Sequence, residues 1–210
     1  MRTGLERADV AAVEIDKEII VVDDHSSDET LDQIKASGVP DVRVIHHAAN
    51  RGKGAAVRSG LEAATGDVVV IQDGDLEYDP KDFVRLIEPI RRGEARVVYG
   101  YRDLSSQTQL YRLGNRFLTL LTNLLFGVTV RDMETCYKVF RSEALASFEI
   151  EEDRFGVEPE ITAKLAKGRW RIYEVGISYS GRTYEEGKKI GWRDGVHALQ
   201  CIVKYNLFRD

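Results

Sequence analysis

The chain has 210 residues and a formal net charge of -5 at pH 7, a balance that argues against general nucleic-acid binding. Its two cysteines, Cys136 and Cys201, form no CxxC pair and the four histidines show no HExxH spacing, so neither a disulfide framework nor a zinc site is expected, and the setting is expected to be reducing and cytosolic. No apolar run reaches the roughly 20 residues of a membrane span, and the charges spread through residues 1–16 predict no signal peptide.

Runs of β-formers and helix-like runs alternate along the chain. The first strand is expected at residues 17–22, followed by a helix capped by Ser27 or Asp28 and ended by Gly38. Further strands are predicted over residues 41–47, 68–71, 95–100, 136–140 and 170–180, and further helices over residues 52–66, 80–92, 110–126, 159–167 and 191–207, with a short one from residue 142. The absence of repeats and linkers predicts one domain over residues 1–210.

This alternation predicts an α/β fold with a mostly parallel central sheet, because strands joined through helices run the same way. Ligands of such sheets bind beyond the carboxyl ends of the strands. Asp23 and Asp24 follow the first strand, and residues 73–77 follow the strand at 68–71. Both acidic clusters are therefore expected in one crevice.

The stretch VVVIQDGDLEYDP carries acids at every second position after its apolar run: Asp73, Asp75 and Glu77. Clustered carboxylates repel one another and are costly to desolvate, so a positive group is expected among them. Gly74 permits the turn that lets two carboxylates converge on one cation, and hard oxygen ligands suit Mg²⁺ or Mn²⁺. A solvated acidic turn is the alternative, and the rest of the chain decides between the two.

Three ordered motifs decide it: EIIVVDDHSSDETLDQI, NRGKGAAVRSGLEAATGDVVVIQDGDLEYDP and DMETCYKVFRSEAL. Together they resemble family 2 glycosyltransferases, and within them the polyprenyl-phosphate (dolichyl-phosphate) mannose and glucose synthases, from about residue 17 to the end. The resemblance implies a GT-A type, Rossmann-like fold with a nucleotide-sugar-binding half at 17–103 and an acceptor-binding half at 104–210. It also implies a nucleotide-sugar donor, GDP-mannose or UDP-glucose, a divalent metal, and a polyprenyl phosphate acceptor.

On the donor side, the resemblance makes Asp73 and Asp75 the metal and diphosphate motif, with Asp75 in the catalytic set and Glu77 as a third metal ligand. Asp23 and Asp24 correspond to the acids that meet the nucleotide base and ribose. Each acid has a structural alternative, since the Asp pair could simply cap the helix that follows.

The remaining donor contacts implied by the resemblance are basic or glycine. Lys53 corresponds to a lysine near the nucleotide, and Gly54 allows close backbone approach. Arg182, with Lys188 and Lys189, corresponds to a basic loop over the donor phosphates, and Arg182 is expected to be catalytic. A solvated lysine and a plain loop are the alternatives.

On the acceptor side, Arg102 and Arg116 correspond to two catalytic arginines that hold the acceptor phosphate. A phosphate monoester has a second pKa of about 6 and needs no base, so the expected reaction is a direct displacement with inversion. Glu158 and Glu160 stand where relatives with alcohol acceptors place a base, and are expected to orient groups or to form an acidic first helical turn.

The uncharged run FLTLLTNLLFGVTV, residues 117–130, is expected either to be a buried helix or to lie against lipid beside the acceptor. The final helix is the second candidate for membrane contact, with packing on the sheet as its alternative. A cytoplasmic protein on the cytoplasmic face of a membrane is therefore the expected setting.

The family normally begins with a strand and loop of the type VVIPAYNEE, which this sequence lacks, and residues 1–16 resemble the remainder of the helix that would follow. A missing central strand predicts unpaired strand edges. The alternatives are a family 2 transferase acting on a saccharide alcohol, a catalytically weak nucleotide-sugar-binding protein, and a nucleotidyltransferase, which would want a glycine-rich basic loop after its first strand.

Overall fold

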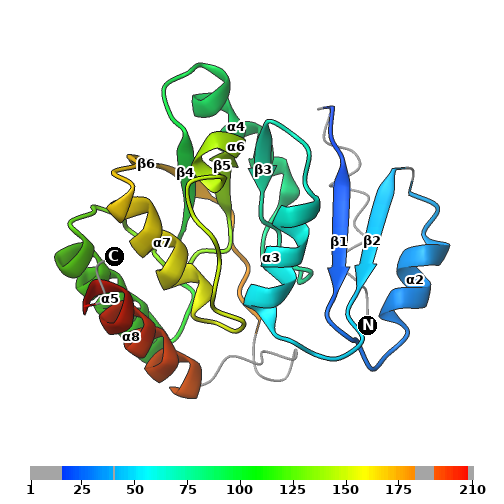
Figure 1. The fold of residues 1–210 in the computed structure, drawn as a ribbon. Helices are drawn as coiled ribbons and strands as arrows, with labels where there is room; N and C mark the ends of the chain where they lie inside the picture. Colours follow the sequence, from blue (N-terminus) through cyan, green and yellow to red (C-terminus); the bar gives the residue numbers. More distant parts are fainter. Residues whose placement is uncertain (1–15, 40, 183–191, 208–210) are drawn as a thin grey trace.

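The computed structural model describes residues 16–39, 41–182 and 192–207. Its strands form two sheets in one α/β unit (Figure 1). β1 (Ile19–Asp23) pairs in parallel with β2 (Val42–His46), and β3 (Val68–Val70), β5 (Lys138–Arg141), β4 (Val97–Arg102) and β6 (Ile172–Ile177) form the second sheet in that order.

In the four-stranded sheet β5 runs antiparallel to both β3 and β4, whereas β4 and β6 are parallel. Strands β3, β4 and β6 therefore point the same way, which confirms the mostly parallel sheet with β5 as its exception. No hydrogen bond between described residues pairs β1 with β3, so the described strands form two separate sheets.

Helices cover both faces of the four-stranded sheet. One face carries the turn η1 (Pro80–Asp82) and α4 (Phe83–Arg91), which pack Phe83 and Leu86 against Val98. The other face carries α7 (Val157–Lys167), whose Ile161 packs with Val97 in a second apolar cluster. Val97 and Val98 belong to opposite clusters because successive strand residues point to opposite faces.

The helix α3 (Lys53–Ala63) bridges the two sheets. It contacts β1, where Gly60 lies against Val22, while its Val57 and Leu61 pack into the core beside α7. In Figure 1 it crosses in front of the gap between β1 and β3. One helix thus holds the carboxyl ends of both sheets at one edge of the molecule.

The remaining described helices complete the fold (Figure 1). They are α2 (Thr30–Ala36), α5 (Gln109–Phe126), the short α6 (Ser142–Leu145) and α8 (Trp192–Leu207), and α8 packs against α5 and α7. The helices and strands expected from residue 17 onward are all present. The helix α2 begins after Glu29, whose own side chain forms no cap, but Asp28 Oδ1 accepts from the Thr30 backbone N–H at 3.1 Å, as expected of a cap at Ser27 or Asp28. Gly38 follows the helix with the positive φ expected.

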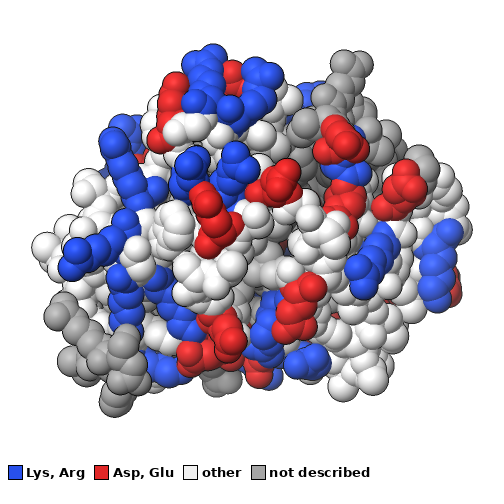
Figure 2. Space-filling view, turned by 45° about the horizontal axis from the view of Figure 1, so that its top comes forward, with Lys and Arg blue, Asp and Glu red and all other residues white. Residues whose placement is uncertain are grey.

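Surface charge is mixed on the face shown in Figure 2, where acidic and basic side chains are interspersed. Both cysteines are buried and free, in agreement with the absence of a disulfide framework. No described helix is long and apolar enough to cross a membrane. Residues 1–15, the expected helix remnant, lie outside the described residues.

Candidate active site

Arg182 is the positive group that the acidic turn after β3 was expected to hold. The Arg182 guanidinium lies 2.8 Å from Asp75 Oδ2 and 3.2 Å from Glu77 Oε1, and its backbone N–H donates to the same Glu77 oxygen. Tyr179 donates its hydroxyl to Glu77 Oε2. Burial raises the pKa of Asp75, and the charges of Asp73 and Glu77 raise it further, while Arg182 opposes this shift. The turn therefore carries more negative charge than its own arginine neutralises.

Lys53, the first residue of α3, is the second cation of the turn. Its ammonium group lies 2.9 Å from Asp73 Oδ2 and 2.7 Å from Glu158 Oε1. Burial alone would lower the pKa of Lys53, but the charges of Asp73 and Glu158 raise it well above its usual value. Lys53 therefore stays charged among three elements that meet at the edge of the sheets.

Asp24 organises the loop before α3. Its oxygens accept hydrogen bonds from the backbone N–H groups of Arg51 and Gly52 at 2.9 and 2.7 Å, and its Oδ1 lies 2.7 Å from His47 Nδ1. Burial alone would raise the pKa of Asp24, but these hydrogen bonds lower it. The two acidic clusters are joined, because the loop that Asp24 holds leads directly to Lys53, which contacts Asp73, and their opening into one crevice stays a prediction.

Asp23 is more enclosed than its neighbour. Its side chain is 1% exposed, its Oδ2 lies 2.7 Å from His46 Nδ1, and its Oδ1 accepts from Ser26. In this arrangement Asp23 fixes the turn after β1, and its contact with a nucleotide stays a prediction.

Gly54 allows a close backbone approach, as expected, but the backbone that approaches is the protein's own. A Cβ at position 54 would lie 1.9 Å from the carbonyl oxygen of Glu152. The neighbouring Ala55 N–H donates to the Asp153 carbonyl at 3.1 Å. The glycine therefore lets the segment at 152–153 pack on the amino end of α3.

Arg102, at the end of β4, lies in a buried cluster. Its guanidinium forms two hydrogen bonds with Asp132, at 2.6 and 2.9 Å, and its other contacts reach Tyr111 and Asn115 of α5 at 3.4 Å. Its guanidinium carbon also lies 5.1 Å from the centre of the Tyr179 ring. Because its side chain is only 5% exposed, this geometry favours a positioning role over direct contact with an acceptor.

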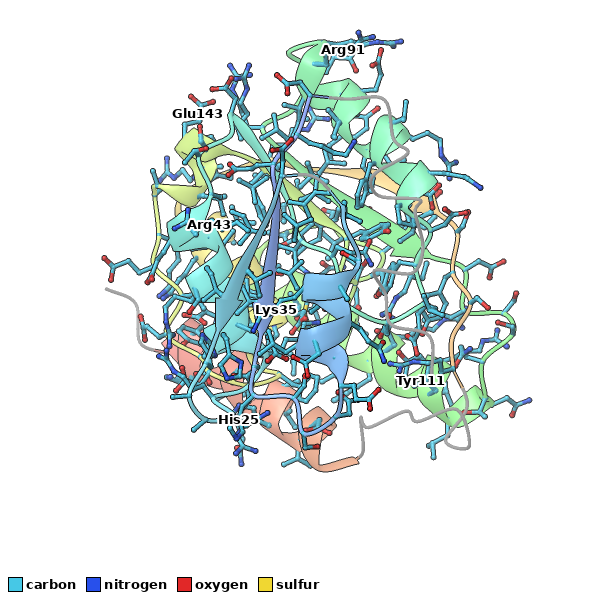
Figure 3. All side chains as sticks on the ribbon, turned by 90° about the vertical axis from the view of Figure 1, so that its right-hand side faces the viewer. His25, Lys35, Arg43, Arg91, Tyr111 and Glu143 are labelled. Atoms are coloured by element: carbon cyan, nitrogen blue, oxygen red, sulfur yellow. The ribbon has the colours of Figure 1, made fainter. Side chains whose placement is uncertain are left out.

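The other two predicted basic residues lie elsewhere. Arg116 is exposed on α5, and no other described residue forms an ion pair or hydrogen bond with its side chain. Lys188 and its neighbour Lys189 lie outside the described residues. In Figure 3, Tyr111 of α5 and His25 at the carboxyl end of β1 lie toward the same end of the molecule, and Arg91 lies at the opposite end.

The sequence interpretation missed Glu134 and Lys138, which follow Asp132 in the motif DMETCYK. Burial and, second to it, the charge of Glu158 raise the pKa of Glu134 to about 7. Lys138 donates its buried ammonium to the carbonyls of Met133 and Thr135. One carboxylate oxygen of Glu134 and one of Glu158 are buried with no hydrogen-bond partner. In the sequence, the only sign of a role for Glu134 was a second acid, Asp132, in the same motif.

Glu160 has a different role from Glu158. It is fully buried and accepts hydrogen bonds from the backbone N–H groups of Glu151 and Glu152 and from Lys164. Glu160 therefore anchors the segment before α7, whereas Glu158 faces Lys53.

The turn at 73–77 offers carboxylate oxygens, which are the donor atoms that a hard divalent cation prefers. Asp73 and Asp75 offer carboxylate oxygens around Gly74, where a Cβ would meet nothing within 4 Å. The raised pKa of Asp75 indicates negative charge that a cation would relieve. Glu77 does not join Asp73 and Asp75 as a third ligand. Its oxygens instead accept hydrogen bonds from Arg182 and Tyr179. The carboxylate oxygens of the three acids do not all lie within 4.8 Å of one another.

Two sequence relatives of the chain are polyprenyl-phosphate mannosyltransferases by name. The chain is 28% identical over 190 residues to an undecaprenyl-phosphate mannosyltransferase of Micrococcus luteus, covering 84% of this chain and 77% of the relative. It is 30% identical over 200 residues to a dolichol-phosphate mannosyltransferase of Pyrococcus furiosus, covering 88% of this chain and 54% of the relative. The chain thus spans about half the length of the second relative.

Solved structures share the fold. Glucosyl-3-phosphoglycerate synthase of Mycobacterium tuberculosis superposes with a TM-score of 0.75 at 22% identity, covering 98% of this chain and 76% of that one. The same enzyme in complex with Mn²⁺, UDP-glucose and phosphoglyceric acid gives 0.73 at 21% identity, with 98% and 75% covered. The fold is therefore of the GT-A type. Residues 8–148 match the profile described as Glycosyl transferase family 2, and the chain belongs to that family of enzymes.

Proposed function

We propose that the chain transfers a hexose, with inversion, from GDP-mannose or UDP-glucose to a polyprenyl phosphate at a membrane surface. The names of the Micrococcus and Pyrococcus relatives, both polyprenyl-phosphate mannosyltransferases, support the acceptor class. Mn²⁺ and UDP-glucose in the Mycobacterium complex support a divalent metal with a nucleotide sugar.

One continuous set of contacts carries the proposal, because it joins the acidic turn to α5. Glu77 accepts from Tyr179, the Tyr179 ring lies under the Arg102 guanidinium, and Arg102 contacts Tyr111 and Asn115 on α5. A donor held at the turn would therefore lie beside the helix that leads to Arg116.

The face of α5 turned away from the core is apolar. Its inward face packs Leu118, Leu121 and Leu125 into the core. Its outward face exposes five large apolar side chains, between 56% and 83% each: Leu110, Leu113, Phe117, Leu120 and Leu124. An exposed apolar stripe of this kind with arginine beside it suits the boundary between lipid headgroups and acyl chains. The inward face is buried as one expectation has it, and the outward face supports the proposal that the helix lies against lipid.

The final helix offers less for membrane contact. Cys201, Ile202 and Tyr205 of α8 are buried in the packed core, and Val196 and Val203 are the large apolar side chains it exposes among its described residues. Packing on the neighbouring helices is its main role.

On the donor side, the chain's own cations face the leaving group. Lys53 and Arg182 stand at the turn where the diphosphate would lie, and both can donate charge-assisted hydrogen bonds to it. A Mg²⁺ or Mn²⁺ ion on Asp73 and Asp75, when bound, would supply Lewis-acid neutralisation of the departing diphosphate.

On the acceptor side, an oxygen of the phosphate forms the new bond to the anomeric carbon as the bond to the diphosphate breaks. The electron pair of that bond leaves with the nucleoside diphosphate, and no proton moves because the phosphate is already anionic. Arg116, exposed on α5, is the cation available to orient the acceptor at the headgroup level. Positioning then contributes more than basicity.

A second acceptor class is favoured by Glu134. A buried carboxyl with a pKa of about 7 and an unpaired oxygen is suited to accept a proton from an alcohol. If the acceptor were an alcohol, Glu134 would act as the general base.

Calorimetric titration with GDP and UDP, each with and without Mn²⁺, followed by a transfer assay with a short polyprenyl phosphate and the matching polyprenol, tests the proposal. Metal-dependent binding of one nucleotide and transfer to the phosphate alone are expected. Transfer to the alcohol alone, or no nucleotide binding by folded protein, overturns it.

The variant Asp75→Asn should lose metal-dependent nucleotide binding. Its matched control is Asp67→Asn, an exposed acid just before β3 at the opposite end of the strand, which should bind as the unmodified chain does.

A further inference from the structure

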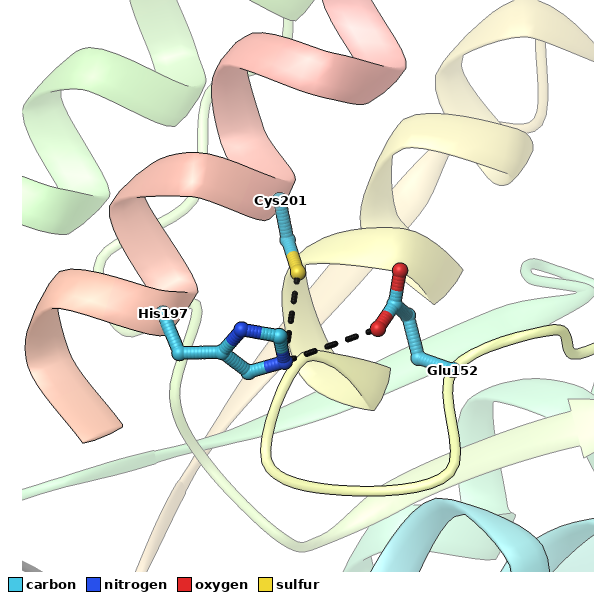
Figure 4. Close-up of side chains that lie close together, drawn as sticks. All are labelled: Glu152, His197 and Cys201. Carbon is cyan, nitrogen blue, oxygen red and sulfur yellow. Dashed lines mark hydrogen bonds and ion pairs between the residues drawn. The ribbon is translucent and has the colours of Figure 1, made fainter. Parts of the chain in front are cut away.

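Three side chains of types that can ligate a metal meet beside α8, apart from the acidic turn: Glu152, His197 and Cys201 (Figure 4). His197 Nε2 lies 3.5 Å from Glu152 Oε2 and 3.7 Å from Cys201 Sγ. All three ligand atoms lie within 4.8 Å of one another, and the described part of the chain holds no other such group of three.

The fold builds this cluster from two elements. His197 and Cys201 stand one helical turn apart and so share one face of α8. Glu152 comes from the segment before α7, and Gly156 leaves the space between them: a Cβ there would lie 2.5 Å from Cys201 Sγ and 3.1 Å from Glu152 Oε2. Any side chain at position 156 would therefore fill the centre of the cluster.

The partners of Glu152 orient its second oxygen toward the cluster. Its Oε1 accepts from Lys204 at 2.7 Å and from Tyr205 at 3.1 Å. Its Oε2 is the oxygen that faces His197. Such outer hydrogen bonds fix a ligating carboxylate and are typical of metal sites.

We propose that Glu152, His197 and Cys201 form a binding site for a divalent transition metal ion, with zinc as the ion that the donor set favours. Around zinc, bond lengths of about 2.0 to 2.3 Å place tetrahedral ligand atoms roughly 3.3 to 3.8 Å apart. The spacings of 3.5 and 3.7 Å fall in that range. Thiolate with imidazole selects zinc or cobalt over Mg²⁺ and Mn²⁺, and three protein ligands leave a fourth position open.

Without a metal, the cluster is a carboxylate beside an imidazole and a buried, free thiol. An ordinary cysteine thiol is protonated at neutral pH. Binding of the ion would release that proton, and the thiolate and carboxylate would then balance the two positive charges. The side chain of His197 is 39% exposed, which leaves a path for entry.

The proposed ion would join α8 to the segment that supports the candidate active site. The carbonyls of Glu152 and Asp153 face Gly54 and Ala55, directly after Lys53. The proposed site differs from the acidic turn in both ligand type and preferred ion.

Cobalt titration of the metal-stripped full chain tests the proposal, since a thiolate–cobalt bond gives a charge-transfer absorption band that oxygen ligands do not. The band should appear with one cobalt per chain, be removed by zinc, and persist in excess Mn²⁺. It should vanish in Cys201→Ser and remain in Cys136→Ser, whose thiol lies beside Asp73. No band in the unmodified chain, or a band that survives Cys201→Ser, overturns the proposal.

A histidine variant decides the matter if Cys201→Ser does not fold. His197→Gln should weaken cobalt binding by more than the roughly 10- to 100-fold that loss of an outer partner costs. The matched control is His25→Asn, because His25 is exposed and has a positive φ that asparagine tolerates. Equal cobalt affinity of His197→Gln and the unmodified chain overturns the proposal, and none of these readouts depends on transferase activity.

Discussion

The ammonium group of Lys53 lies 2.7 Å from Glu158 Oε1, which ties the start of α3 to the first turn of α7. The same ammonium lies 2.9 Å from Asp73. Two carboxylates from distant segments are therefore paired with the same cation.

Lys53→Met should lower the free energy of unfolding by about 3 kcal/mol, because it leaves two largely buried carboxylates without their counter-charge. Urea unfolding near neutral pH measures the change. Lys35→Met, an exposed change on α2 (Figure 3), should stay within about 0.5 kcal/mol. Adding Glu158→Gln to Lys53→Met should recover part of the loss. If Lys53→Met is as stable as the control Lys35→Met, the assigned pairing of Lys53 with the two carboxylates is contradicted.

Arg182→Gln should change metal and nucleotide binding in opposite directions. Loss of the guanidinium leaves Asp75 and Glu77 with more negative charge, so Mn²⁺ alone should bind roughly 10-fold more tightly near pH 8. Binding of the nucleoside diphosphate with Mn²⁺ should weaken by a similar factor of roughly 10, since a charge-assisted donor is lost. Calorimetry measures both.

The pH dependence expected of Arg182→Gln follows from Asp75. The pKa of Asp75 is already raised, and it should rise further without Arg182. The tighter Mn²⁺ binding of the variant should therefore fade as pH falls and Asp75 takes up a proton. Arg91→Gln, at the far end of the molecule, is the matched control. If Arg182→Gln weakens the binding of both Mn²⁺ and the nucleotide, Arg182 and Mn²⁺ do not compete for the negative charge of the turn.

Local patterns were sufficient to predict the individual elements. The helix expected at 110–126 is α5 at Gln109–Phe126, because its apolar spacing and the glycine that follows act locally. The antiparallel course of β5 and the separation of β1 from β3 depend on pairing between distant strands, which periodicity does not encode.

The same limit applies to the site. Asp73, Asp75 and Arg182 could be named from ordered motifs, and the structure brings Arg182 to Asp75. The roles of Arg102 and Glu134 could not be predicted, because each depends on burial against segments remote in the chain, including Asp132 and Glu158. Motifs identify residue types, whereas burial and pairing decide what each group does.

Glu134 should make stability depend on pH. The pKa of its carboxyl is about 7 in the folded chain, against 4.5 for an ordinary glutamate. The folded state therefore holds a proton that the unfolded state releases. The contribution to stability is fully present below about pH 4.5 and is lost as pH rises toward about 7.

Glu134→Gln should remove this slope and raise the free energy of unfolding near pH 8 by about 1 to 3 kcal/mol. Urea unfolding from about pH 5 to about pH 8 measures it, with the exposed Glu94→Gln as control. An unchanged slope in Glu134→Gln would show that the carboxyl is already ionised in this range.

The exposed face of α5 should govern association with lipid vesicles. Each large apolar side chain that enters the interface contributes about 1.4 kcal/mol or more, equivalent to about tenfold in partitioning. Leu113→Gln and Leu120→Gln, 63% and 56% exposed, should therefore each reduce binding to anionic vesicles by about tenfold and leave the free energy of unfolding nearly unchanged. Vesicle sedimentation measures the binding, and Val84→Gln, 58% exposed on α4, is the matched control because that helix lies on another face of the protein. If all three variants bind vesicles as the unmodified chain does, α5 does not contact the lipid, and the acceptor must reach the acidic turn by another surface.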